Sequence, residues 1–327
     1  MQRAHGLIKS SNHILILTHK NPDGDAVGSM LGLALALTSV GKNVECFSKD
    51  AVPRYFDFLP EISIIKGQTS REKYDLVILL DCALFQRTGL ENIKEILSYY
   101  DGLLILDHHP KTQTECDNVK NCVDIIDHKT SSTAVLVYNL LKEMNINITK
   151  DISNCLLTGI FTDTGGFQHK NTDPQSLEAA AEFMKKGSRI EKIAKNIFSN
   201  KRMAAIRLWG LALSRIRTDE QTGMAVSYVS KKDMDDLGTK EDDLAGLVNV
   251  INTISDAKFS LLLTEYEDHK IKGSLRSEEY KGIDVSRIAR SLGGGGHKLA
   301  SGFEIDGEIE DSILKISKMI NEVKNNK

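Results

Sequence analysis

Four short apolar runs in the first half of the chain, each followed by acidic or histidine residues, constrain the fold most strongly. The runs are residues 14–17, 76–80, 103–106 and 155–161. Short apolar runs that end in turns are typical of buried strands in a parallel sheet. Ligands of open α/β sheets gather outside the carboxyl ends of such strands. The polar residues that follow the four runs are therefore predicted to meet at one edge of a sheet.

These polar residues are mostly carboxylates and imidazoles. In chain order they are His19, Asp23 and Asp25, then Asp81, then Asp107, His108 and His109, and finally Asp163. Clustered carboxylates repel one another unless a cation neutralises them. The pattern therefore predicts a metal-dependent hydrolase that binds more than one metal ion.

The first site also has a simpler interpretation as a turn. Pro22, Asp23, Gly24 and Asp25 form a sequence with good turn chemistry. The preceding strand and the nearby histidine favour a metal site instead. Gly24 and Gly28 are expected to let the backbone approach a phosphate closely, and the helix that begins near residue 26 is expected to offer its positive N-terminus to an anion.

The other three sites differ in how specific they are. Asp81 follows a very apolar strand and is the best candidate to bridge two metal ions, although a helix-capping role remains an alternative. Two histidines directly after Asp107 form the most specific local signal, because one imidazole can bind metal while the next contacts substrate. Asp163 is the only carboxylate in residues 158–166, where an ordinary loop is the alternative.

The pattern of elements predicts two α/β domains. Helical stretches at 26–40 and 131–144 alternate with strands at 44–48 and 122–126, which favours a parallel sheet over residues 1–190. Residues 191–217 are predicted to form a helical connector. Residues 218–327 are expected to form a smaller mixed α/β domain with strands at 224–229, 259–264 and 271–275 and helices at 284–292 and 310–323.

A run of four glycines marks the second domain. Gly293, Gly294, Gly295 and Gly296 precede His297. Backbone amides in such a loop can form an anion-binding nest, and Arg276 has a guanidinium suited to phosphate. A flexible linker is the alternative for the glycines, and a surface charge is the alternative for the arginine.

Composition limits the partners and the cellular setting. The formal net charge of -3 gives no basic excess of the kind expected for binding long nucleic acid. The five cysteines are odd in number and form no Cys-x-x-Cys pair, so neither a disulfide framework nor a thiolate zinc site is expected. The N-terminus lacks the apolar stretch of a signal peptide, and the most apolar segment, residues 30–37, is too short to span a bilayer. A cytoplasmic protein without membrane contact is predicted.

Taken together, these motifs closely resemble those of the DHH phosphoesterase superfamily, in the branch with a DHH-associated C-terminal domain. The four N-terminal motifs and the glycine-rich motif occur in order along nearly the whole chain, and Ser301 is the one small departure. The two-domain form is similar to the group of oligoribonucleases, or nanoRNases, that also act as adenosine 3′,5′-bisphosphate phosphatases.

The resemblance implies two divalent ions, with manganese expected, and two-metal activation of water. One ion would be bound by His19, Asp23 and Asp81, and the other by Asp25, Asp81, His108 and Asp163. Asp107 and His109 would support catalysis near the substrate. The substrate would be bound by Arg276, Gly294, Gly295, Gly296 and His297. Closure between the domains would exclude bulk water. The implied substrates are short RNA, dinucleotides or a bisphosphate nucleotide.

Other functions remain open at this stage. A phosphodiesterase that cuts cyclic di-AMP uses the same metal core and is the nearest alternative. A RecJ-like exonuclease on long DNA and an inorganic pyrophosphatase fit the second domain less well. A nucleotide-binding sensor without catalysis is the alternative from another class. The sequence leaves the oligomeric state undetermined, with a homodimer as one option.

Overall fold

The computed structural model describes residues 1–70, 73–90, 100–109, 113–117, 119, 121–199, 201–296 and 298–325. The chain divides into two compact units, Met1–Asn200 and Lys201–Lys327. The division falls inside the segment 191–217 that was predicted as a connector. The first helix of the second unit, α8 (Met203–Ser214), buries Leu208 and Ala212 in that unit's own core.

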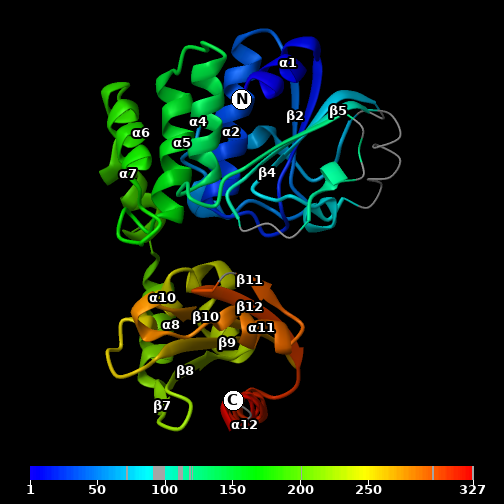
Figure 1. The fold of residues 1–327 in the computed structure, drawn as a ribbon. Helices are drawn as coiled ribbons and strands as arrows, with labels where there is room; N and C mark the ends of the chain where they lie inside the picture. Colours follow the sequence, from blue (N-terminus) through cyan, green and yellow to red (C-terminus); the bar gives the residue numbers. More distant parts are fainter. Residues whose placement is uncertain are drawn as a thin grey trace. The chain divides into compact units, whose positions relative to one another are not determined.

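A six-stranded parallel sheet forms the centre of unit 1 (Figure 1). The strand order is β3-β2-β1-β4-β5-β6, and every described pairing in it is parallel. The strands are β1 (His13–Leu17), β2 (Asn43–Phe47), β3 (Ile65–Lys66), β4 (Tyr74–Leu80), β5 (Tyr100–Asp107) and β6 (Cys122–Ile126). The predicted parallel α/β fold is confirmed, and the carboxyl ends of β1, β4 and β5 lie side by side as neighbouring strands.

Alternating side chains of the strands pack into cores on opposite faces of this sheet. Ile14 and Ile16 belong to the core that the helices cover, whereas Leu15 and Leu17 belong to a second core with Phe85. This alternation follows from the period of two in a strand. Among the residues that the structure describes, the helices of unit 1 are α1 (Gln2–Ser10), α2 (Gly24–Ser39), α4 (Thr133–Glu143), α5 (Lys150–Asp163), α6 (Pro174–Lys185) and α7 (Ile190–Ala194).

The apolar run 155–161 is part of α5, so the prediction of a strand there was wrong. Thr149 caps the helix by accepting a hydrogen bond from the amide of Ile152. The helix is buried on most of its circumference against α2 and α4, which Figure 1 shows side by side. A short run that is apolar all round does not distinguish a buried helix from a buried strand.

The glycines of α2 serve helix packing. A Cβ atom on Gly28 would lie 2.4 Å from the carbonyl oxygen of Cys155, and one on Gly24 would lie 2.3 Å from Oγ1 of Thr162. Both contacts are with α5. These glycines therefore let α2 and α5 approach each other more closely than a side chain would permit, and their close approach to a phosphate stays a prediction.

Unit 2 contains a mixed sheet with helices packed against it. The strand order is β11-β12-β10-β9-β8-β7, in which β8 and β9 are parallel and the other pairs are antiparallel. The strands are β7 (Arg217–Asp219), β8 (Met224–Val229), β9 (Phe259–Glu267), β10 (Lys270–Ser277), β11 (Gly295–Gly296) and β12 (Ala300–Asp306). With α8, the helices are α9 (Lys231–Leu237), α10 (Leu247–Asn252), α11 (Val285–Ser291) and α12 (Ile309–Asn325).

Short helical turns complete the described structure. They are η1 (Arg54–Phe56), η2 (Ile62–Ile64), η3 (Phe85–Thr88), η4 (Glu115–Asp117), η5 (Lys195–Ser199, a π-helical turn), η6 (Glu241–Leu244) and η7 (Glu279–Lys281). Among the described residues, none of the helices has both the length and the apolar character that crossing a bilayer requires.

Cys116 and Cys122 form a single disulfide, where neither a disulfide framework nor a thiolate zinc site was expected. Their Cα atoms lie 5.2 Å apart, because the turn at η4 returns the chain to the start of β6. The other three cysteines, Cys46, Cys82 and Cys155, are buried thiols. Spacing along the sequence could not reveal this return of the chain.

Candidate metal centre

The turn after β1 places its two aspartates in different environments. Asp23 is exposed and caps α2, since its Oδ1 accepts hydrogen bonds from the amides of Asp25 (3.0 Å) and Ala26 (3.1 Å). The N-terminus of α2 is thus capped by the chain's own carboxylate, and an anion site there stays a prediction. Asp25 is 1% exposed and lies inside the domain. His19 donates from Nδ1 to the Lys20 carbonyl oxygen at 2.7 Å, which directs its Nε2 toward Asp81.

Two helices secure the carboxylate of Asp25. Its Oδ2 accepts the amide of Thr133 at 2.6 Å, and its Oδ1 accepts the amide of Ala134 at 2.9 Å and the hydroxyl of Ser29 at 3.1 Å. The two amides belong to the N-terminus of α4, where the helix dipole favours negative charge. The carboxylate is therefore fixed in direction as well as buried.

Asp81 occupies the centre of the cluster. It follows β4 directly and has a φ of 60°, a left-handed conformation that is uncommon outside glycine and is found more often at functional sites. Its Oδ2 lies 3.3 Å from Nε2 of His19, and its Oδ1 lies 3.6 Å from Nε2 of His108 and 3.4 Å from Nδ1 of His109. The two oxygens of this carboxylate thus face different histidines.

The Asp-His-His run at the end of β5 contributes two imidazoles with different partners. Nδ1 of His109 donates to Oδ1 of Asp107 at 2.6 Å, and the backbone amide of His109 donates to the same oxygen at 3.1 Å. His108 instead directs Nε2 toward Asp25, Asp81 and Asp163. Neighbouring residues at a strand end can therefore serve different purposes.

Asp163 enters the cluster from the last residue of α5. Its Oδ2 lies 3.8 Å from Nε2 of His108 and accepts a hydrogen bond from Nδ2 of Asn171 at 3.0 Å. A helix end thus supplies the carboxylate that the sequence suggested would follow a strand. The structure brings together all eight predicted residues of the first domain, which come from the ends of β1, β4, β5 and α5 and the start of α2.

The cluster strongly favours added positive charge. Burial raises the pKa of Asp25 well above its usual range, and the charges of Asp81 and Asp23 raise it further. Burial likewise raises the pKa of Asp163, with contributions from Asp25 and Asp23. Both shifts reflect negative charges held close together away from water.

The histidines respond to the same field in different ways. Burial lowers the pKa of His19, but its hydrogen bond to Asp81 and the charges of Asp23 and Asp81 outweigh burial and raise the pKa to about 9. Burial also opposes protonation of His109, yet its hydrogen bond to Asp107 and the charges of Asp81 and Asp107 together shift its pKa upward. Burial dominates at His108 and lowers its pKa. His108 is therefore the imidazole best suited to act as a neutral ligand.

The residues present fit a bound divalent cation. Nε2 of His108 is buried and has no hydrogen-bond partner among the described residues. Carboxylate oxygens of Asp25, Asp81 and Asp163 surround it at 3.6–3.8 Å, which is too long for hydrogen bonds. Ligands about 2.1 Å from one octahedral ion lie roughly 3 Å apart. A cation among these atoms would satisfy the imidazole and neutralise the carboxylates.

Two overlapping groups of ligand atoms can be distinguished. Those of His19, Asp23 and Asp81 lie within 4.8 Å of one another, as do those of Asp81, His108 and His109. Asp81 belongs to both groups, which fits a bridging carboxylate. Imidazole nitrogens and carboxylate oxygens together suit first-row transition-metal ions.

Unit 2 contains the predicted substrate-binding residues. Nε of Arg276 donates to Oδ1 of Asn249 at 3.1 Å, and Nη1 donates to the carbonyl oxygen of Leu275 at 2.8 Å. Arg276 pairs with Ala300 of β12, whose residues Ser301 and Gly302 pair with Gly296 and Gly295. The sheet thus brings the arginine and the glycine motif close together. His297 lies outside the described residues.

The glycine run is ordered in part as an edge strand. Gly295 and Gly296 form β11, and a Cβ atom on Gly294 would lie 2.2 Å from the carbonyl oxygen of Gly302. Close packing against β12 therefore requires glycine at position 294. This packing role stands beside the predicted anion-binding role of the same residues.

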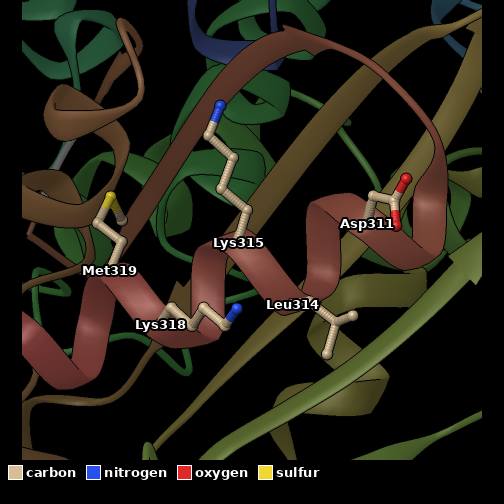
Figure 2. A pocket seen from close by; sticks show the side chains of 5 residues that line it. All are labelled: Asp311, Leu314, Lys315, Lys318 and Met319. Carbon is tan, nitrogen blue, oxygen red and sulfur yellow. The ribbon is translucent and has the colours of Figure 1, made fainter.

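A hollow on α12 provides no comparable cluster of ligands. It is lined by Asp311, Leu314, Lys315, Lys318 and Met319. Figure 2 shows that these side chains project from the helix without converging on one point, and only one of them is a carboxylate. The candidate metal centre of unit 1 remains the best-supported functional site.

Sequence reasoning missed the residues that hold the carboxylates in place. Thr133 and Ala134 bind Asp25, Thr133 also binds Asp81, and Asn171 binds Asp163. The one available signal was the run of hydroxyl residues at 130–133, where α4 begins. The side chain of Ser132 at the N-cap makes no capping hydrogen bond.

Comparison with protein families agrees with this arrangement. Residues 13–160 match the model of the DHH family, N-terminal domain, and residues 221–326 match the model of the DHHA1 domain. The two matches fall on the two units in chain order. Together they include all of the candidate residues except Asp163, which lies three residues beyond the first match.

Relatives and solved structures cover most of the chain. The bifunctional oligoribonuclease and PAP phosphatase NrnA of Thermus thermophilus is 29% identical over 94% of this chain and 89% of the relative. The protein of the same name from Bacillus subtilis is 25% identical over 89% of each chain. A crystal structure of an exopolyphosphatase-related protein from Bacteroides fragilis matches with a TM-score of 0.88 and 27% identity, over 98% of this chain and 96% of that one.

A more distant structure shares only the fold. RecJ of Thermus thermophilus, solved in complex with Mn²⁺, matches with a TM-score of 0.58 and 14% identity. The match covers 100% of this chain and 55% of RecJ.

Proposed function

Since the chain belongs to the DHH family of phosphoesterases, we propose that it is a manganese-dependent enzyme that hydrolyses short oligoribonucleotides and adenosine 3′,5′-bisphosphate. The observation that carries the proposal is the buried, unpartnered Nε2 of His108 facing three carboxylates. The relatives named for these two activities, which match about nine-tenths of this chain, support the choice of substrates.

We assign one ion to His19, Asp23 and Asp81 and the other to Asp25, Asp81, His108 and Asp163. Two divalent ions, when bound, supply an activated water and neutralise phosphoryl oxygens. Manganese is our choice because the family resemblance implies it, and a mixed set of imidazole and carboxylate ligands is compatible with first-row divalent ions. A structure of RecJ with this metal shows only that the fold can accommodate it.

The chain's own residues would position the phosphate and stabilise its charge. Nδ1 of His109 is engaged by Asp107, so we place this imidazole beside the metal centre as a donor to the phosphoryl group. Its raised pKa favours the charged form, which suits stabilisation of negative charge. Asp107 orients the ring. Substrate binding by Arg276 and by the glycine motif with His297 is part of the same proposal.

The test is a hydrolysis panel with and without Mn²⁺. The substrates are a linear diadenylate, adenosine 3′,5′-bisphosphate and cyclic di-AMP. We expect metal-dependent turnover of the first two and slower cutting of the cyclic dinucleotide. Faster turnover of cyclic di-AMP than of linear diadenylate would transfer the assignment to a cyclic dinucleotide phosphodiesterase. Absence of any metal-dependent turnover would leave a binding protein.

A matched pair of variants links turnover to the cluster. Asp81→Ala should abolish turnover and lower the metal content, because both proposed ions share this carboxylate. Asp75→Ala is the control, since Asp75 lies on the same strand but binds the amides of Asn12 and His13 at the opposite end. Near-normal activity of a folded Asp81→Ala protein contradicts the bridging role.

A further inference from the structure

Thr133 connects two of the proposed metal ligands. It is fully buried as the first residue of α4. Its backbone amide donates to Oδ2 of Asp25 at 2.6 Å, and its hydroxyl donates to Oδ1 of Asp81 at 2.9 Å. These carboxylates come from elements 108 and 52 residues away in the sequence. One residue therefore fixes the relative placement of two ligands.

The Thr133 hydroxyl restricts rotation of the Asp81 carboxylate about the last bond of its side chain. Rotation of a carboxylate about its last side-chain bond is broadly tolerated, and a bridging carboxylate must aim each oxygen at a different ion. Oδ2 of Asp81 faces His19, whereas Oδ1 faces His108 and accepts the Thr133 hydroxyl. The Thr133 hydroxyl donates to Oδ1 and His19 contacts Oδ2, so the two contacts together select this orientation.

The neighbouring hydroxyls make no comparable contact. Those of Thr130, Ser131 and Ser132 are buried without a hydrogen-bond partner among the residues that the structure describes. Within the run 130–133, contact with the carboxylates is thus made by the hydroxyl of Thr133. A general need for polar residues before α4 does not explain this selectivity.

We propose that Thr133 is a positioning residue that holds Asp81 in the orientation required to bridge two divalent ions. The inference rests on the proposed metal function. Loss of the hydroxyl leaves the hydrogen bond from the Thr133 backbone amide to Asp25 in place. The loss should therefore change mainly the orientation of the bridging carboxylate of Asp81. Removing a hydrogen-bond partner that orients a metal ligand typically lowers metal affinity or activity by about 10–100-fold.

The experiment compares Mn²⁺ binding to metal-free wild-type, Thr133→Val, Thr133→Ser and Thr158→Val proteins by calorimetry. Thr158 is the matched control, because it is buried and its hydroxyl donates only to the Asn154 carbonyl within α5. We expect about 10–100-fold weaker binding for Thr133→Val. Thr133→Ser and Thr158→Val should bind Mn²⁺ as wild type does. The Mn²⁺ concentration for half-maximal turnover should shift in parallel, with little change in substrate KM at saturating metal.

The outcomes distinguish failure of the proposed metal function from failure of the positioning role of Thr133. If wild-type protein binds no Mn²⁺, the proposed metal function fails. If wild type binds Mn²⁺ and folded Thr133→Val binds it equally well, the positioning role is overturned. Thermal unfolding without metal establishes that each variant is folded. If Thr133→Val is unfolded, Thr133→Ala replaces it, since a smaller side chain cannot collide with the carboxylates, and the same two results decide.

Discussion

Replacing Gly28 by alanine tests how closely helix packing and metal binding are coupled. The added Cβ atom would lie 2.4 Å from the carbonyl oxygen of Cys155 and 2.8 Å from the amide nitrogen of Gly159. Both atoms belong to the backbone of α5, so no flexible side chain can move aside. Ordinary contact begins at 3.4 Å, and α2 and α5 must therefore separate by about 1 Å.

The expected loss of stability follows from this separation. Overpacking of a filled interior costs typically about 1–3 kcal/mol. For a domain of this size each kcal/mol lowers Tm by roughly 2–4 °C, which gives a fall of roughly 2–12 °C. The same shift moves Asp163, at the end of α5, away from His108. We therefore also expect Mn²⁺ affinity to fall by about 10-fold or more.

Thermal unfolding followed by circular dichroism, with and without Mn²⁺, measures both effects. Gly6→Ala is the control, because Gly6 is an exposed helical residue of the same unit and has open space around its Cβ position. Alanine there should raise stability by up to about 1 kcal/mol through helix propensity. The reasoning is refuted if Gly28→Ala melts at or above the wild-type temperature and binds Mn²⁺ normally.

Three further predictions concern single side chains. His109→Ala should keep both ions in metal analysis yet lose on the order of 100–1000-fold in kcat, and loss of an ion would show that His109 is a ligand. Arg276→Ala should lower kcat/KM on a dinucleotide by about one to two powers of ten, and equal losses on a small generic phosphodiester would contradict a role in substrate binding. Asp233 has its pKa lowered to about 2, because hydrogen bonds from Arg215 and Ser230, together with the charge of Arg215, outweigh the opposing effect of burial. Its contribution to the stability of unit 2, about 1–2 kcal/mol after allowance for solvent screening, is present above pH 4 and is lost as pH falls toward 2. Urea unfolding can be followed by the fluorescence of Trp209. The difference in free energy of unfolding between wild type and Asp233→Asn should shrink as the pH falls from 4 toward 2.

The placement of the candidate residues was predictable where strands carry them. His19, Asp81 and Asp107 each follow a run of buried aliphatic residues, and parallel strands end at the same edge of a sheet. The pairings of β1 with β4 and of β4 with β5 bring these ends together. In this part of the site, hydrophobic patterning and the position of a polar residue were sufficient.

Asp163 shows where patterning failed. The run before it is apolar on nearly all sides because α5 is covered by α2, α4 and α6, and such a run has no helical stripe to recognise. The presence of Asp163 in the cluster was nevertheless predicted. Carboxylates that lie close together need a neutralising charge whichever secondary structure carries them. Chemistry was here a better guide than periodicity.

The residues that orient the ligands were beyond the reach of sequence reasoning for a different reason. Thr133 and Asn171 have side chains common in turns, and their importance arises only from partners far away in the chain. A carboxylate can be suspected from its own charge, whereas a hydroxyl becomes significant only when a buried carboxylate accepts its hydrogen bond. The same chain geometry that makes Gly28 indispensable brings α4 and α5 against Asp25: a Cβ atom on Gly159 would lie 2.9 Å from Oδ1 of Asp25. Helix packing, ligand orientation and metal affinity are therefore expected to change together when any one of them is perturbed.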